Sequence, residues 1–353
     1  MSKQMIQETL KQHRKREYRR LVIILSFLVI AFVSLVFDIV TGPSMLPIKE
    51  VLLALLNPIF PQEGIDKISL MIVNDLRLPM ALMALIVGGA LGVGGAEIQT
   101  LLNNPMASPY TLGLAAASGF GASLVIAFGS FGLPLIVAVP LGAFLMAMVC
   151  ASILFGLAGL KQFNSTLLVL VGIALLFLFQ SLLSLVQYLS SPEISQQILF
   201  WLFGSLQKAN WINVGVVFIV AFFCITFLFK DVWALTALRL GEERAKAMGV
   251  NLNRLRFKVL VFVSIMTATA ISFVGVIGFI GLVAPHIARV LVGEDQRFFL
   301  PSAMFVGAAF LSIASVLSKV IIPGALFPVG IITSFVGVPF FFWIILSKKQ
   351  STC

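Results

Sequence analysis

Ten apolar runs, each about 17 to 27 residues long, divide this 353-residue chain. A helix rises 1.5 Å per residue, so each run can cross a hydrocarbon layer of about 30 Å. Charged residues make up only 11% of the chain, against roughly 25% in a soluble domain. We therefore predict an all-α integral membrane protein with about ten transmembrane helices. The runs are residues 21–40, 78–102, 111–128, 133–159, 167–189, 211–229, 257–275, 276–292, 300–322 and 326–346.

Lys and Arg are distributed unevenly between the two ends of these runs. If the N-terminus lies in the cytoplasm, 19 of the 24 Lys and Arg residues fall in inner segments. Inner segments of helical membrane proteins carry such an excess. The sequence therefore predicts a basic cytoplasmic tail over residues 1–20, one transmembrane domain over 21–346 and a cytoplasmic tail over 347–353. The same distribution explains the net charge of +10 without nucleic-acid binding.

Residues 230–258 are the one long polar, charge-rich segment in the last three quarters of the chain. Apolar residues recur there at helical spacing, and Gly241 and Gly249 interrupt them. We expect a cytoplasmic loop with one or two short amphipathic helices, on which Glu242 and Glu243 face water. No GxxxxGK[ST] phosphate-binding loop occurs in the chain. The loop is therefore expected to bind a soluble partner that supplies the energy.

Three glycines in the second run, Gly88, Gly92 and Gly95, share one helical face. Small residues at this spacing allow another helix backbone to approach closely within a membrane. We therefore predict a central, buried helix over residues 78–102. No strand precedes the glycines, so they do not form a nucleotide-binding loop.

Few side chains within the runs could carry chemistry. Glu97 either lines a pathway or simply reaches water near the inner end of its run. His286 has no second His or Cys at helical spacing, which favours a packing or capping role over metal binding. Cys150 and Cys224 lie inside apolar runs and indicate neither a disulfide framework nor a metal site. We find no catalytic constellation, so we expect a transport protein without an enzymatic site, a cofactor or a metal.

Two inner loops each contain a short, uncharged stretch of turn-forming residues. They centre on Asn104 and Met106, and on Ser165 and Thr166. A neutral constriction suits a gate for a bulky, partly charged solute that must not be retained. A plain tight turn is the simpler interpretation of such residues.

Arg77 and Lys319 each lie at the outer end of a run. A cation in this position either meets carboxylates of an external partner or anchors its helix at the membrane surface. The residues alone leave both interpretations open.

Six stretches of the sequence run in a fixed order over about 270 residues, and the fifth of them is highly specific. They are LRLP (76–79), GAEIQTLLNNPMASPYTLG (95–113), FWLFGSL (200–206), LGEERAKAMGV (240–250), VGVIGFIGLVAPHIARVLVGEDQRFFLP (274–301) and PVGIITSFVGVPFFFWIIL (328–346). Together they resemble the permease subunits of the iron-siderophore, haem and cobalamin importers of the ABC class, the type II importers.

The resemblance implies a type II importer permease fold with ten helices in each subunit. It implies a pathway between this subunit and a second permease, which is either another copy or a paralogue. Two ATPase subunits would bind below, carrying ATP and Mg, and a substrate-binding protein would bind above.

The resemblance also implies roles for particular residues. The family's coupling helix falls on Leu240, Gly241, Glu242, Glu243, Ala245, Met248 and Gly249. Its cytoplasmic gate falls on Asn104, Met106, Ser165 and Thr166, and its outer docking cations fall on Arg77 and Lys319. The chain departs from the family at the outer end, where Met80 replaces a frequent arginine and Ser315 replaces a usual acidic residue.

We therefore expect a permease that moves an iron-siderophore complex, or a haem- or cobalamin-like chelate, across the bacterial cytoplasmic membrane. Oxyanions such as molybdate are less favoured as substrates than these chelates. The alternative from a different class is an ion-coupled secondary transporter. That class needs midplane carboxylates and unwound helices, for which Glu97 alone is a poor candidate.

Overall fold

Helices form all the regular structure in the computed structural model, which describes residues 3–44, 46–58, 60–61, 66–130, 132–160, 165–322 and 324–347. They are α1 (Lys3–Val40), α2 (Ile48–Leu56), α3 (Lys67–Met71), the π-helical turn η1 (Ile72–Arg77), α4 (Leu78–Leu101), α5 (Leu114–Phe128), α6 (Leu135–Leu160), α7 (Ser165–Leu189), α8 (Pro192–Leu202), α9 (Trp211–Phe229), α10 (Val232–Leu238), α11 (Glu242–Ala247), α12 (Leu252–Val274), α13 (Ile280–Val292), α14 (Gln296–Val320) and α15 (Val329–Ser347).

Each of the ten predicted membrane segments corresponds to a helix. Seven helices in the described part of the chain are long and apolar enough to span a membrane, and α5, α13 and α15 are shorter apolar helices. The predicted break between the seventh and eighth segments is confirmed, because α12 ends at Val274 and α13 begins at Ile280. Gly275 and Phe279 both have positive φ there, at 77° and 67°, which a continuous helix does not allow.

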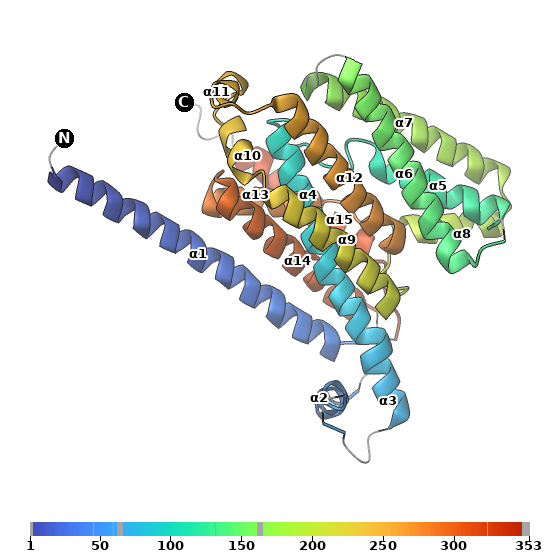
Figure 1. Cartoon of the computed structure of the whole chain (residues 1–353). Coiled ribbons are helices and arrows are strands. Elements are labelled where there is room, and N and C mark those ends of the chain that lie inside the picture. The colour runs from blue at the N-terminus through green and yellow to red at the C-terminus, as the bar shows by residue number, and fades with distance from the viewer. Residues whose placement is uncertain are drawn as a thin grey trace.

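The helix α4 lies at the centre of the bundle. Figure 1 shows it between α14 on one side and α12 and α9 on the other, while α5, α6, α7 and α8 form a group on the far side of α12, against which α5 and α6 pack. The most apolar stretch of the span that contains α4 is 72% buried, whereas that of the peripheral α1 is 22% buried. The predicted central position of the second run is therefore confirmed.

The three glycines of α4 make this central position possible. A methyl group on Gly88 would clash with the carbonyl oxygen of Gly307 in α14, and one on Gly92 would clash with that of Ala303. On Gly95 it would clash with the backbone of α13. The helix backbones therefore touch directly, as small residues permit in a membrane.

Residues 1–20 were predicted to form a basic cytoplasmic tail; from Lys3 onward they are helical and continue into the first span as α1. Lys, Arg, Gln and Glu are good helix formers, so the polar residues lengthen the first helix beyond the apolar run instead of ending it.

Arg20 lies 3.6 Å from Asp295, which precedes α14 and also binds Arg297. Burial raises the pKa of Asp295, but the hydrogen bonds and charge of Arg297 and the charge of Arg20 outweigh this and hold the pKa below its usual value.

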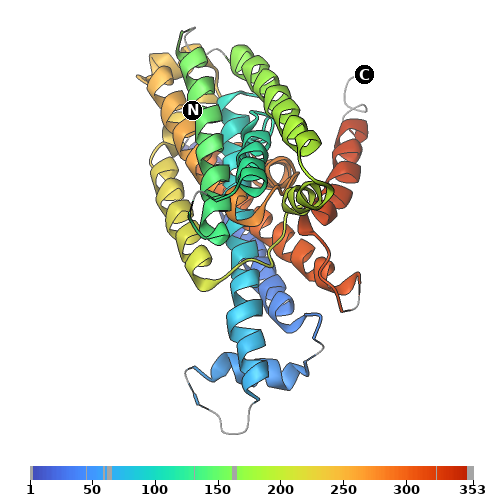
Figure 2. The same ribbon diagram turned by 90° about the vertical axis from the view of Figure 1, so that its right-hand side faces the viewer.

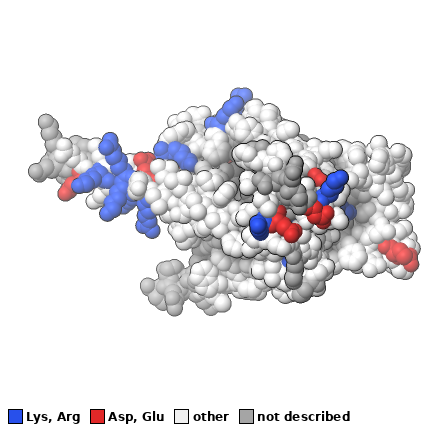
Figure 3. All heavy atoms as spheres, turned by 90° about the horizontal axis from the view of Figure 1, so that it is seen from below, with Lys and Arg blue, Asp and Glu red and all other residues white. Residues whose placement is uncertain are grey.

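The helix α1 has 38 residues, or about 57 Å at 1.5 Å per residue, and its first turns project from the bundle (Figure 1). Basic side chains gather along this projection (Figure 3). Both α1 at its start and α15 at its end lie toward the end of the bundle that carries α11 (Figures 1 and 2). The short helices α2 and α3 lie at the opposite end.

We predict that Gly92→Ala lowers the stability of the protein by about 1–3 kcal/mol, because the added methyl group overpacks a direct backbone contact. The matched control is Gly215→Ala in α9, where a methyl group meets nothing within 4 Å. Thermal unfolding of both purified variants in one detergent provides the measurement. Equal unfolding temperatures for the two variants would contradict the assignment of α4 as the tightly packed centre.

Candidate transport and coupling sites

The polar loop between α9 and α12 contains the two short helices α10 and α11. It is shorter than predicted, because residues 252–258 already belong to α12. Ala245 of α11 is fully buried, whereas Leu240 and Met248 at its two ends are 52% and 63% exposed. Figure 1 shows α11 at the outermost end of the bundle. The loop is thus anchored at its middle and presents two apolar side chains outward.

Glycines and ion pairs fix the orientation of α11. Gly241 and Gly249 flank it with φ of 110° and 83°, a backbone conformation that favours glycine. Glu242 accepts a hydrogen bond from Arg256 of α12 at 2.5 Å. Glu243 pairs with a lysine one turn along α11 and, like Glu242, is exposed. The predicted exposure of both carboxylates is confirmed.

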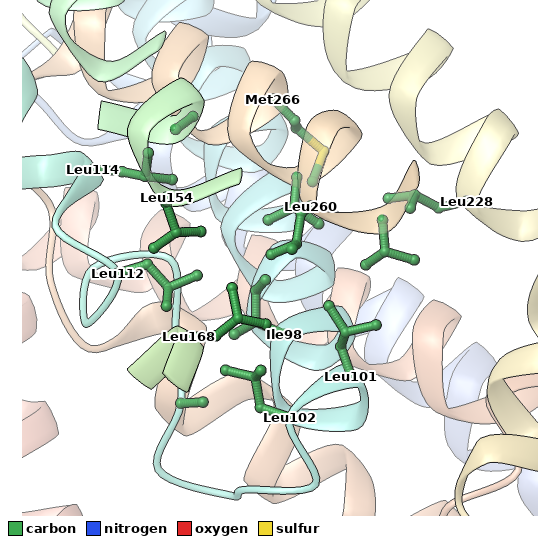
Figure 4. Close-up of a cluster of buried hydrophobic side chains, with 14 of the residues drawn as sticks. Ile98, Leu101, Leu102, Leu112, Leu114, Leu154, Leu168, Leu228, Leu260 and Met266 are labelled. Atoms are coloured by element: carbon green, nitrogen blue, oxygen red, sulfur yellow. The ribbon is translucent and has the colours of Figure 1, made fainter. Parts of the chain in front are cut away.

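The loop that follows α4 is a fixed turn. Asn104 accepts a hydrogen bond on its side-chain oxygen from the Met106 amide at 2.9 Å, which places Met106, 52% exposed, at the tip. Leu102 and Leu112 anchor the two ends of the loop in the buried cluster shown in Figure 4. The sequence prediction of a tight turn is therefore confirmed, and the gate role of Asn104 and Met106 stays a prediction.

The second predicted gate segment lies at the start of α7. Ser165 and Thr166 are the first residues of α7, while the rest of their loop, residues 161–164, is outside the described residues. One half-turn further on, Leu168 is fully buried and belongs to the same cluster as Leu112 of the α4–α5 loop (Figure 4). The start of α7 and the end of the α4–α5 loop therefore share one buried cluster, and the gate role of Ser165 and Thr166 stays a prediction.

Glu97 of α4 is fully buried. Neither of its carboxylate oxygens has a hydrogen-bond partner within the part of the chain that the structure describes. The interpretation that Glu97 reaches water is therefore wrong. A buried acid in a membrane helix is a functional candidate, but no described contact assigns a role to it.

Arg77, at the outer end of its run, is buried, with only 3% of the residue exposed. Its guanidinium donates hydrogen bonds to the carbonyl oxygens of Ile39 at 3.2 Å, Val40 at 2.8 Å and Ser44 at 3.3 Å. These carbonyls end α1 and begin the next loop, so Arg77 caps the C-terminus of that helix. It fastens α1 to η1.

Lys319, at the outer end of its run, is also buried, with 4% of the residue exposed. Its ammonium group lies 2.8 Å from a carboxylate oxygen of Asp38 and donates a hydrogen bond to the Asp38 carbonyl at 2.7 Å. Burial of a lysine requires such a partner. The docking role of Arg77 and Lys319 stays a prediction, and it requires both side chains to leave these partners.

We predict that Lys319→Met destabilises the protein by about 3–5 kcal/mol, because it leaves the Asp38 carboxylate buried without a counter-charge. Combining it with Asp38→Asn should restore most of the stability, since no charge then remains. The unfolding temperatures of the single and double variants in detergent test this. A double variant as unstable as the sum of the two single variants would show that the two groups do not act as a pair.

An apolar cavity of about 520 Å³ lies between α8, the break before α13 and α15. Figure 2 shows α8 and α15 side by side. The lining contains no charged residue, and Ser334 is its one polar side chain. A methyl group on Gly330 of α15 would clash with the carbonyls of Phe203 and Val276, so the three elements meet closely at one edge. The cavity has a size that suits a small organic ligand.

The predicted packing role of His286 agrees with its place in the fold. Its ring meets the ring of Phe340 of α15 edge-on, with centroids 6.1 Å apart. Across the described residues no group of three or more His, Cys, Asp or Glu side chains could hold a metal ion.

The described residues thus form a bundle of apolar helices with a two-helix loop at one end and an apolar cavity between α8, α13 and α15. The family model described as the FecCD transport family matches residues 28–347. The chain belongs to the FecCD transport family and is a permease subunit of the ABC importer class. This membership replaces the ion-coupled alternative, and it makes the chain a transport component rather than an enzyme.

Several named relatives are similar over most of their length. The hemin transport system permease protein HmuU of Yersinia pestis is 35% identical, over 78% of this chain and 83% of that protein. The vitamin B12 import system permease protein BtuC of Vibrio vulnificus is 33% identical over the same shares. The molybdate import system permease protein MolB of Haemophilus influenzae is 32% identical, over 81% of this chain and 84% of that protein.

A solved structure confirms the fold. It shows an ABC transporter of the metal-chelate type in an inward-facing conformation, with a TM-score of 0.80 and 29% sequence identity. The match covers 92% of this chain and 99% of that chain. The predicted type II importer permease fold is therefore confirmed.

Sequence reasoning missed two features of these sites. Asp38, the counter-charge of Lys319, lies inside the first apolar run, and an ionisable residue in a membrane span is a signal that could have found it. The apolar cavity gave no such signal, because residues from three separate stretches line it.

Proposed function

We propose that this chain is the transmembrane subunit of an importer that carries a ferric siderophore or a similarly bulky metal chelate. The observation that carries the proposal is the uncharged, apolar lining of the cavity between α8, α13 and α15. A bulky chelate spreads its charge and can slide along such a wall. A small divalent oxyanion would be desolvated there without a compensating cation, which is costly.

The proposal places the α11 end of the bundle in the cytoplasm of a bacterial cell. The distribution of Lys and Arg supports this orientation, since the first turns of α1 and the α10–α11 loop lie toward that end and Arg289 shares Glu294 with Arg239 of that loop. Two ATPase subunits, with ATP and Mg bound to them, would dock on the exposed Leu240 and Met248. A substrate-binding protein would deliver the chelate to the α2 end.

A second permease subunit completes the pathway in this proposal. Helix α15 presents a row of exposed apolar side chains next to the cavity, among them Phe335 at 75% and Phe342 at 60% exposure. Such a face is covered by lipid or by another subunit. ATP-driven movement of the α10–α11 loops would switch the subunit interface between two states, and the turns at Asn104, Met106, Ser165 and Thr166 would close its inner end.

The substrate can be tested with the complete complex in liposomes, where the permease is joined by its ATPase and binding protein. We expect ATP-dependent uptake of a ferric siderophore, with haem and cobalamin as close competitors and molybdate excluded. Uptake of radiolabelled substrates from one panel provides the measurement. Preferential molybdate uptake would contradict the assignment to bulky chelates, and uptake that follows an imposed proton gradient without ATP would contradict the ABC mechanism.

We predict that Met248→Glu weakens ATPase binding by about tenfold or more and abolishes uptake while the protein remains in the membrane. The reason is that a charge in the centre of an apolar contact, desolvated without a partner, costs more than about 1.4 kcal/mol. Asn253→Glu is the matched control, because it adds the same charge to an exposed residue five positions further on. Unchanged ATPase co-purification with Met248→Glu would contradict the proposed docking surface.

A further inference from the structure

Arg239 lies at the base of the α10–α11 loop, directly after α10. Its side chain is only 16% exposed, although the loop itself protrudes. One terminal nitrogen donates a hydrogen bond to the side-chain oxygen of Asn103 at 2.6 Å, and the other forms an ion pair with Glu294. One side chain therefore joins the α10–α11 loop to the loop after α4 and to the turn between α13 and α14.

The contacts continue from Glu294 back to the α4–α5 loop by a second route. Glu294 lies 3.4 Å from Arg289 at the end of α13, and Arg289 donates a hydrogen bond to the side-chain oxygen of Gln99 at 2.9 Å. The backbone carbonyl of Gln99 accepts a hydrogen bond from the Asn104 amide at 3.1 Å. Two chains of polar contacts thus lead from Arg239 to adjacent residues of the α4–α5 loop.

The residue that Arg239 holds has an unusual backbone. Asn103 has a φ of 47°, one of two positive values among non-glycine residues in the described chain. Asparagine tolerates this left-handed conformation better than most residues, but it remains less favourable than the helical one. The next residue, Asn104, sets the turn that presents Met106. A displacement of Arg239 would therefore act on the point where the direction of this loop is set.

We propose that Arg239 is the positioning residue through which movement of the α10–α11 loop reaches the gate turn at Asn103–Met106. This inference rests on the proposed function, in which the ATPase moves that loop. Arginine suits the task because its planar fork can hold two acceptors at once, whereas lysine presents a single point charge. Since Asn103 and Glu294 lie 136 and 55 residues away in sequence, no local structure imposes these contacts.

The simplest competing explanation is that Arg239 is a static staple that only stabilises this end of the bundle. A staple changes stability but does not decide whether the gate turn responds to ATP. The test must therefore measure the response of the gate turn and, separately, the stability and assembly of the complex.

A label on Met106→Cys reports on the turn, because Met106 is exposed and Cys150 and Cys224 are at most 1% exposed. Cys353→Ser removes the third cysteine. The complete complex, with its ATPase and second permease, is reconstituted with a nitroxide at this position. Its spectrum is then recorded with and without ATP. We expect ATP to change the label's mobility in the complex that retains Arg239.

The label reports the ratio of the two states of the gate turn. In Arg239→Gln we expect the change of this ratio on adding ATP to be smaller by roughly 2- to 30-fold, the range found for residues that couple distant sites. Arg239→Lys should give an intermediate response. ATPase co-purification and unfolding temperature should stay close to those of the unsubstituted complex. The matched control is Arg254→Gln, an exposed arginine of the neighbouring α12 without an ion pair among the described residues, and it should respond fully.

The possible results distinguish a failure of the Arg239 positioning role from a failure of the proposed function. A full ATP response in Arg239→Gln would overturn the positioning role while leaving the proposed function intact. A loss of unfolding temperature with an unchanged ATP response would identify Arg239 as a staple. Absence of any ATP response in the complex that retains Arg239 would contradict the proposed function and, with it, this inference.

Discussion

The direct contact of the α4 backbone with α14 and α13 is the constraint on which the rest of the structure depends. In lipid, helices gain little from burying apolar side chains against each other, because the lipid tails are equally apolar. Close packing must take over, and Gly88, Gly92 and Gly95 allow it. The α4–α5 loop, which we propose as a gate, continues directly from α4, and α10 packs against α4 and α14. A shift of the central helix would therefore displace this loop and the α10–α11 loop together.

The polar interactions of the bundle have different roles at its two ends. At the α2 end, Arg77 and the Asp38–Lys319 pair are buried and hold α1 in place. At the α11 end, Arg239, Glu294 and Arg289 join separate segments in a partly exposed network. A buried charge that loses its partner is costly, and this cost falls where water reaches one of the paired groups, as it reaches Glu294. This contrast fits a subunit that is held firmly at one end and is driven at the other.

The sequence predicted the parts of the fold that follow from local pattern. The ten segments, the break near Gly275, the buried glycine face and the amphipathic α11 all depend on the spacing of neighbouring residues. It did not predict the contacts that depend on residues far apart in the chain, or where a helix continues past a change in charge. Lys319 finds Asp38 at a separation of 281 residues, so its burial could not be read from its place at the end of a run. The charge of residues 1–20 suggested a tail, yet their helix propensity continued α1.

In the proposed importer, the partner that hydrolyses ATP binds the α11 end of this permease. A photocrosslinking amino acid placed at Met248 in α11's flanking turn, or at Ile48 in α2, tests this in membranes that contain the whole complex, since both side chains are exposed at opposite ends of the bundle. The account predicts that the ATPase subunit is captured from position 248 and not from position 48. Capture of the ATPase from position 48 alone would contradict it.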